Sequence, residues 1–134
     1  MATRRAARRL AVAILYQADV THREPAEVLA ERRGLGEKVP GFAEELILGV
    51  QEHLADLDRV IGDHADEWTV ERMAAIDRSL MRVACLEMLH RDDVPVPVAI
   101  DEAVEAAREL STEDSGRFVN GVLGRIASER RRAG

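Results

Sequence analysis

Aromatic residues and cysteine are both scarce in this 134-residue chain. Phe, Trp and Tyr together make up 3% of the residues, whereas Ala, Leu, Val, Glu and Arg dominate. That balance favours helices over a β-sandwich, and no stretch alternates between apolar and polar residues as a half-buried strand does. The single cysteine, Cys85, excludes an internal disulfide and predicts a buried thiol in a reducing compartment.

The chain also lacks a long hydrophobic run. Arg4 to Arg9 precede the apolar stretch Leu10 to Leu15, an order that resembles a signal peptide, but the stretch is short and soon meets Gln17 and Asp19. No segment approaches the roughly 20 apolar residues needed to span a bilayer. We therefore expect a cytoplasmic protein that does not act at a membrane.

Groupings of residues typical of catalytic or metal sites are missing as well. The four histidines are far apart in the sequence, with no H-x-x-x-H pair and no second cysteine to complete a metal site. No serine lies in a nucleophile elbow, and Gly34-Leu-Gly-Glu-Lys38 is an incomplete phosphate loop with no strand before it. We expect no catalytic residues, no metal and no cofactor, and therefore no enzyme.

The net charge of −6 conceals an uneven distribution. Residues 1–23 contain five Arg and one Asp, and residues 117–134 contain five Arg and one Glu, so each end carries a formal charge of +4. Residues 24–116 carry −14. Two basic ends on an acidic body indicate a local site for a polyanion, while the acidic body discourages indiscriminate binding. Solvated termini are the alternative interpretation of the same charges.

Apolar residues recur at helical spacing through most of the chain, which predicts an all-α protein. The expected helices cover Thr3–Val20, Ala26–Arg33, Phe42–Asp63, Val70–His90, Pro97–Leu110 and Ser111–Ile126. Thr69 and Ser111 are the expected N-caps of the fourth and last helices, with Asp114 completing a capping box after Ser111. We expect a single domain, residues 1–134, built as a bundle of about six to seven helices with the apolar Val70–His90 helix near its centre.

Residues 1–9 form an arginine-rich segment at the start of the first expected helix. Arg4 and Arg8 are four residues apart, as are Arg5 and Arg9, so repulsion within each pair destabilises the helix. The positive end of the helix dipole disfavours arginines in these first turns as well. We therefore expect a partly flexible start, which a phosphate backbone would order by neutralising the arginines.

Glu87 and two mid-helix glycines depart from the regular pattern. Glu87 falls on the buried stripe of its helix, where an unpaired carboxylate is costly, so we expect it to pair either with free N–H groups near Pro97 or with a nearby arginine. Gly121 and Gly124 each cost the last helix about 1 kcal/mol relative to alanine. Either tight packing between helices or close approach of a partner or nucleic-acid backbone would explain these glycines.

Several segments share residue types with a known family. In the C-terminal half they are Asp93-Val-Pro, Ala99-Ile-Asp-Glu-Ala-Val-Glu and Asp114-Ser-Gly-Arg-Phe-Val-Asn-Gly-Val-Leu. Together these resemble the C-terminal signature of the NusB family of bacterial transcription antitermination factors. Further matches are Arg4-Arg-Ala-Ala-Arg, Leu15-Tyr16 and Ile76-Asp-Arg-Ser-Leu-Met-Arg-Val-Ala, whereas residues 21–40 and 50–72 match only in helical pattern.

The resemblance implies a compact, non-catalytic all-α protein that binds boxA-type RNA from ribosomal RNA leader transcripts. It further implies the ribosomal protein NusE as a partner, and a role with RNA polymerase in resisting premature termination. By the same resemblance, the RNA-binding residues are Arg4, Arg5, Arg8, Arg9, Tyr16, Arg117, Phe118 and Asn120, and the partner-binding residues are Asp77 and Asp114. Phe118 fits the core stripe of its helix equally well, so its role as core anchor or contact residue stays open.

Two other classes of protein compete with this interpretation. One is a helical protein-interaction scaffold or homodimer, in which the arginines only increase solubility. The other is the RNA-binding accessory domain of a ribosomal RNA cytosine methyltransferase, which has a similar fold. Such an enzyme needs a downstream nucleotide-binding domain, whereas this chain ends at Gly134, so we favour the antitermination factor.

Overall fold

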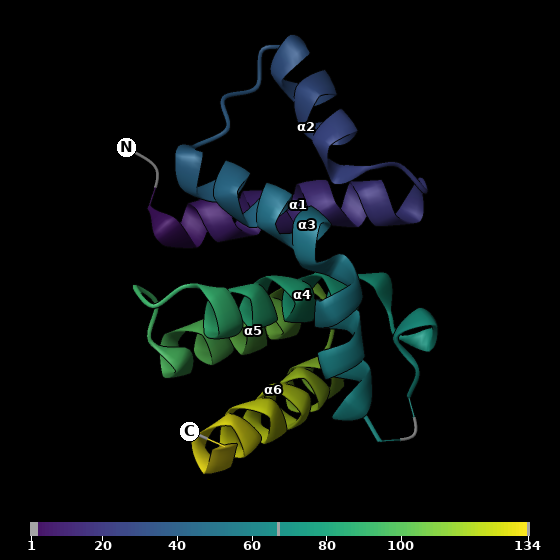
Figure 1. Ribbon diagram of the computed structural model, residues 1–134. Coiled ribbons are helices and arrows are strands. Elements are labelled where there is room, and N and C mark those ends of the chain that lie inside the picture. The colour runs from purple at the N-terminus through teal and green to yellow at the C-terminus, as the bar shows by residue number, and fades with distance from the viewer. Residues whose placement is uncertain (1–2, 67, 134) are drawn as a thin grey trace.

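The computed structural model describes residues 3–66 and 68–133, and every regular element within them is a helix (Figure 1). The α-helices are α1 (Arg4–Val20), α2 (Pro25–Gly34), α3 (Gly41–Asp63), α4 (Ala75–His90), α5 (Val96–Leu110) and α6 (Glu113–Ala133), and a short 3-10 helix, η1 (Val70–Arg72), precedes α4. The prediction of an all-α fold with six to seven helices is confirmed. None of the described helices is both long and apolar enough to pass through a lipid bilayer.

Local sequence signals explain where several helices begin. The Thr3 hydroxyl accepts a hydrogen bond from the Ala6 N–H at 3.0 Å and so caps α1. Pro25 and Pro97 lie in the first turns of α2 and α5, where a missing N–H costs nothing. These three helices therefore begin within a residue or so of the positions that their capping residues and prolines predict.

The helix α4 lies at the centre of the bundle, as its apolar sequence predicted. It packs against α1, α3, α5 and α6, and residues on most of its sides are buried. The long helix α3 joins the two ends of the bundle: its first half lies beside α1 and α2, and its second half reaches α6 (Figure 1). A kink at His53, with φ of −104° and ψ of 15°, lies between these halves.

Cys85 lies on α4 and is completely buried, as predicted. Burial, together with the nearby charge of Asp58, raises the pKa of its thiol to about 12. The thiol therefore stays protonated and acts as a small apolar core residue.

The fourth helix begins later than predicted. Val70–Arg72 form η1, the backbone is extended at Met73, and α4 begins only after it. Arg78 explains the interruption, because its Nη1 donates hydrogen bonds to the carbonyls of Val70 and Met73 at 3.0 and 3.2 Å. Those carbonyls are thereby satisfied without a continuous helix. Thr69 lies at the N-cap position of η1 and makes no side-chain cap hydrogen bond there, so its predicted role as the N-cap of the long fourth helix is wrong.

The predicted N-cap of the last helix is wrong by one residue. Ser111 is the C-cap of α5, with φ of −137° and ψ of −109°, which is not the extended conformation of an N-cap. The Thr112 hydroxyl instead accepts a hydrogen bond from the Ser115 N–H at 3.0 Å and caps α6. Asp114 still lies in the first turn of α6, where its charge interacts favourably with the helix dipole.

A buried ion pair joins α1 to α4. The Nε of Arg8 donates to both carboxylate oxygens of Glu87 at 2.9 and 3.0 Å, and its Nη2 donates to one of them at 2.9 Å. Arg8 is 8% exposed and Glu87 only 1%. Of the two partners expected for Glu87, the structure therefore supplies the arginine and not the N–H groups near Pro97.

The substitution Arg8→Met removes the cation and leaves the Glu87 carboxylate buried without its partner. We expect the free energy of unfolding to fall by about 3–5 kcal/mol, the cost of breaking a buried pair. The double variant Arg8→Met/Glu87→Leu removes both charges and should recover most of that loss. Urea denaturation of the three proteins measures the effect, and a loss below about 1 kcal/mol in the single variant would contradict it.

His64 ends α3 and connects it to α6. Its Nδ1 lies 2.7 Å from the carbonyl oxygen of Val60, and its Nε2 pairs with the carboxylate of Glu129. Both partners accept hydrogen bonds, so the imidazole satisfies both only when each nitrogen carries a proton. Burial by itself would lower the pKa of His64, but the Val60 carbonyl and the Glu129 carboxylate outweigh burial and raise the pKa above its usual value.

We expect His64 to stabilise the fold in acid more than in alkali. Because its pKa is higher in the folded than in the unfolded protein, its contribution is fully present below the unfolded value of 6.5 and is lost as pH rises through the folded pKa. His64→Gln should therefore cost more stability near pH 5.5 than near pH 8.5. Urea denaturation of both proteins at the two pH values tests this, and equal losses would contradict it.

Candidate nucleic-acid interface

The arginine-rich segment forms the first turns of α1, and three of its guanidinium groups reach solvent. Arg4 Nη2 donates to Asp93 Oδ2 at 2.6 Å, and Arg9 Nη1 donates to Glu109 Oε2 at 2.9 Å. Arg5 faces two glutamates of α5. These acidic partners offset the repulsion among the arginines, and α1 is helical from Arg4 onward. Partial flexibility of residues 1–9 stays a prediction, and residues 1–2 lie outside the described part of the chain.

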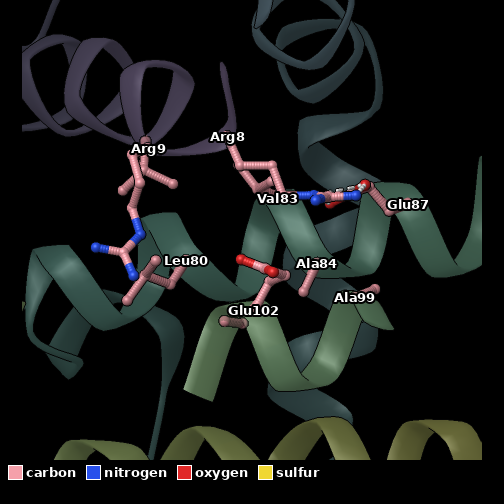
Figure 2. A pocket seen from close by; sticks show the side chains of 10 residues that line it. Arg8, Arg9, Leu80, Val83, Ala84, Glu87, Ala99 and Glu102 are labelled. Carbon is pink, nitrogen blue, oxygen red and sulfur yellow. Dashed lines mark hydrogen bonds and ion pairs between the residues drawn. The ribbon is translucent and has the colours of Figure 1, made fainter. Parts of the chain in front are cut away.

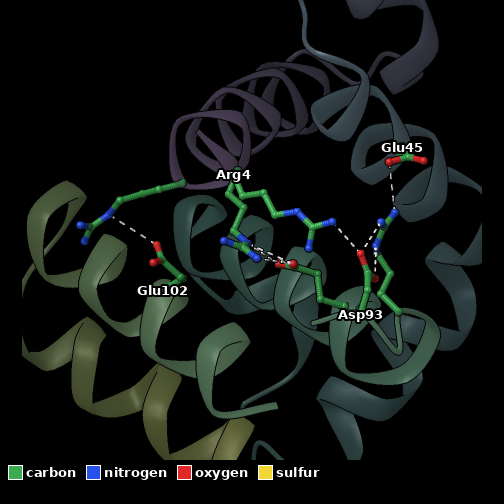
Figure 3. Close-up of polar contacts among 8 residues, drawn as sticks. Arg4, Glu45, Asp93 and Glu102 are labelled. Atoms are coloured by element: carbon green, nitrogen blue, oxygen red, sulfur yellow. Dashed lines mark hydrogen bonds and ion pairs between the residues drawn. The ribbon is translucent and has the colours of Figure 1, made fainter. Parts of the chain in front are cut away.

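A further arginine, Arg91, lies beside Arg4 around the ring of Phe42. The guanidinium carbons of Arg4 and Arg91 are 4.4 and 5.0 Å from the ring centroid, within the range of cation–π interactions. Asp93 accepts hydrogen bonds from both arginines (Figure 3). The hydrogen bond from Arg91, followed by that from Arg4, holds the pKa of Asp93 well below its usual range. Arg91, which the sequence analysis missed, thus belongs to the same cationic surface.

Of the remaining predicted residues on α1, Arg8 lies inside the protein and Tyr16 on its surface. The Arg8 guanidinium is committed to Glu87 in the core, so this residue does not present its charge to a strand as the sequence analysis expected. Tyr16 is 40% exposed. It follows Arg9 by seven residues and Arg5 by eleven, so it shares their face of the helix.

A groove lies where the start of α6 meets the chain that leads into α4. We call it the Trp68–Phe118 groove; its lining residues are Trp68, Arg72, Met73, Ala74, Asp77, Asp114, Ser115 and Phe118. The Phe118 ring meets that of Trp68 edge to face, with centroids 6.5 Å apart and planes at 71°. Phe118 also packs against the core, as its core-stripe interpretation predicted, whereas its role as a contact residue stays a prediction. Trp68 is 53% exposed. The sequence analysis did not select this residue, and the only sign of it in the sequence is that the single tryptophan lies in a polar connection between two helices.

Asp77 places a hydrogen-bond acceptor in the Trp68–Phe118 groove. One carboxylate oxygen, Oδ2, accepts a hydrogen bond from the Ser115 hydroxyl at 3.1 Å, whereas Oδ1 is buried and has no hydrogen-bond partner in the described part of the chain. Burial raises the pKa of Asp77 above its usual value, and the hydrogen bond from Ser115 partly opposes that rise.

The exposed face of α6 carries the other predicted residues. Arg117 and Asn120 are exposed, and Arg117 pairs with Asp114 at the edge of the groove. Arg125 donates two hydrogen bonds to the His64 carbonyl at 2.9 and 2.7 Å and so has a structural role. Of the basic C-terminal end, the side chains of residues 131–134 lie outside the described part.

The two mid-helix glycines of α6 do not serve tight packing between helices. A Cβ at Gly124 would meet nothing within 4 Å, and one at Gly121 would meet only the Arg125 side chain at 3.6 Å. By contrast, a Cβ at Gly49 of α3 would lie 2.7 Å from Leu86 of α4, so Gly49 is where two helices come close. Close approach of a partner or a nucleic-acid backbone at Gly121 and Gly124 stays a prediction.

A sequence model of the NusB family matches residues 5–128, nearly the whole chain. The chain belongs to the NusB family. It is similar to the transcription antitermination protein NusB of Salinispora arenicola (strain CNS-205), with 46% identity over 134 residues that cover 95% of this chain and 96% of that protein. Membership confirms the family suggested by the sequence. It also confirms that the protein is not an enzyme, because the NusB family consists of transcription antitermination factors.

Solved structures agree on the NusB fold. A structure of T. maritima NusB has a TM-score of 0.85 and 33% identity, covering 96% of this chain and 92% of that chain. A chain from the crystal structure of antitermination factors NusB and NusE in complex with double-stranded RNA has a TM-score of 0.83 and 24% identity, covering 94% of this chain and 96% of that chain. At this lower identity the likeness bears on the fold alone.

Gly124 and Gly49 should respond to alanine in opposite directions. We expect Gly124→Ala to raise the free energy of unfolding by about 1 kcal/mol, because alanine favours the helix and the space is open. Gly49→Ala should lower it by about 1–3 kcal/mol, because the new methyl group would overlap Leu86 in the core. Urea denaturation measures both changes. If the free energy of unfolding changed in the same direction in both variants, packing at these positions would differ from that in the structure.

Proposed function

We propose that this NusB-family protein is a transcription antitermination factor that binds boxA-type leader RNA of ribosomal RNA operons. The observation that carries the proposal is the row of solvent-facing arginines at the start of α1, at Arg4, Arg5 and Arg9. Guanidinium groups bind phosphates through several N–H donors at once. Three of them on one short stretch of helix provide the electrostatic part of RNA binding.

Recognition of single-stranded RNA also needs groups that meet exposed bases. We assign this role to Tyr16 on α1, to Phe118 in the Trp68–Phe118 groove, and to Asn120 and Arg117 on the exposed face of α6. Trp68 adds an aromatic surface to the same groove. With only four aromatic residues in the chain, stacking platforms are few, so we expect weak binding by the protein alone.

The partner that we propose is the ribosomal protein NusE. We assign Asp77 and Asp114, which line the Trp68–Phe118 groove, as the residues that contact it. The position of both carboxylates in the lining of the groove supports this assignment. The structure of NusB and NusE with RNA, a complex that contains the same fold, supports the choice of partner. In this proposal the pair acts in the cytoplasm within an antitermination complex on RNA polymerase and opposes premature termination.

A salt titration tests the RNA-binding proposal. The affinity for a boxA-type single strand is measured with and without NusE at several salt concentrations, for the wild type and for Arg4→Ala/Arg5→Ala/Arg9→Ala. Each neutralised phosphate contributes a log–log slope of about −0.7, so loss of three contacts should reduce the slope by about 2. NusE should raise the affinity of the wild type for the strand.

The matched control replaces three arginines elsewhere, Arg23, Arg33 and Arg59, with alanine and so removes the same charge. Its slope should stay close to that of the wild type. If the two triple variants behave alike, or if the wild type with NusE ignores the strand in dilute buffer, the RNA-binding proposal fails. The rival scaffold or homodimer would then be favoured, and sedimentation of the wild type would show whether it self-associates.

A further inference from the structure

Three glutamates lie along one side of α5, facing the arginines of α1. Glu102, Glu105 and Glu109 are three and four residues apart, so they share one face of the helix. The ion pairs follow the same order along both helices, with Arg5 beside Glu102 and Glu105, and Arg9 beside Glu109. The glutamates thus form a row against part of the surface that we propose binds RNA.

Carboxylate oxygens occupy N–H donors that a phosphate would need. Arg9 Nη1 lies 2.9 Å from Glu109 Oε2, and Arg5 Nη2 pairs with Glu105. Guanidinium groups bind carboxylates and phosphates through the same planar set of donors. A phosphate that uses these donors must therefore displace a glutamate.

The ion pairs of Glu105 and Glu109 are weak enough for a phosphate to displace them. The side chains of Glu105 and Glu109 are 51% and 53% exposed. Exposed ion pairs of this kind are individually weak and are screened by salt. Once released, both carboxylates can be hydrated, so their displacement costs little beyond the lost pairing.

Glu102 differs from its two neighbours because it is partly buried. Its side chain is 23% exposed, and its Oε2 lies 3.5 Å from Arg5 Nε. That oxygen is buried without a hydrogen-bond partner in the described part of the chain. Figure 2 shows the Glu102 carboxylate in a small cavity between α1, α4 and α5, on the side of Arg8 and Arg9. If Arg5 moved away, this oxygen would lose its nearest cation, so displacing Arg5 carries an additional cost.

We propose that Glu102, Glu105 and Glu109 form an intramolecular competitor that occupies Arg5 and Arg9 until a nucleic-acid strand displaces it. This inference rests on the proposed RNA contacts of those two arginines. Every strand that uses them bears the same penalty, so a strand that offers only phosphates binds weakly. A strand that also gains contacts in the Trp68–Phe118 groove, or with NusE, keeps a useful affinity.

The test measures RNA affinity after the charges of Glu105 and Glu109 are removed. Glu105→Gln/Glu109→Gln keeps the shape and polarity of both side chains but weakens their hold on Arg5 and Arg9. Two exposed pairs should account for roughly a tenfold gain in affinity in dilute buffer. The gain should be similar for a boxA-type strand and for oligouridine of the same length, and it should shrink as salt screens the ion pairs.

The control is Glu52→Gln/Asp101→Asn, which removes two exposed negative charges, one of them on α5. Neither residue pairs with an arginine of α1 in the described part of the chain. This control separates local competition from general repulsion between the acidic body and RNA. Thermal unfolding checks that both double variants are folded.

Three outcomes would overturn the competitor. Unchanged affinity in the Gln variant would show that the glutamates do not compete, and reduced affinity would show that they position the arginines for RNA. An equal gain in the control would assign the effect to overall charge. Because oligouridine requires no boxA recognition, the competitor can still be tested if boxA specificity fails. If wild-type binding does not depend on Arg4, Arg5 and Arg9, the proposed function itself fails, and the competitor with it.

Discussion

The buried ion pair between Arg8 and Glu87 holds the first helix against the central one, and the placement of the polar surface depends on it. Because Arg8 binds both oxygens of Glu87, α1 cannot turn about its axis without breaking contacts in the core. Arg9 is thereby directed toward α5, and Arg4 toward the ring of Phe42. We interpret the pair as fixing this orientation, because a buried ion pair adds little stability over apolar packing.

The acidic body and the basic start of the chain are not separate regions in the folded protein. In the sequence they are distinct blocks of opposite charge, which suggested a free cationic end. In the structure each solvent-facing arginine of α1 is paired with a carboxylate of α5 or of the loop before it. The charge that attracts a polyanion is therefore partly balanced within the molecule, so net charge alone overstates how available these arginines are.

Most of the fold could be predicted from the sequence because helices leave periodic patterns and local caps. The stripes of α1, α3 and α5 placed these helices closely, and the apolar α4 proved central, whereas α6 continues to Ala133, seven residues beyond the predicted end at Ile126. Errors arose in the connections that precede α4 and α6. Arg78 holds the turn before α4 through carbonyls that it meets only in the folded chain. Ser111 and Thr112 both fit the pattern of an N-cap, and only the turn between α5 and α6 selects the second.

The sequence by itself determined the helical class and the family, and it supplied the residues that we propose meet RNA or a partner, since all of these depend on local patterns and residue types. Only the tertiary structure decided which of those residues are available. It buried Arg8, and it brought in Trp68, a residue outside the predicted set, which is exposed beside Phe118. The physical reason is that exposure and pairing are set by neighbours far away in the chain, as Arg8 and Glu87, 79 residues apart, demonstrate.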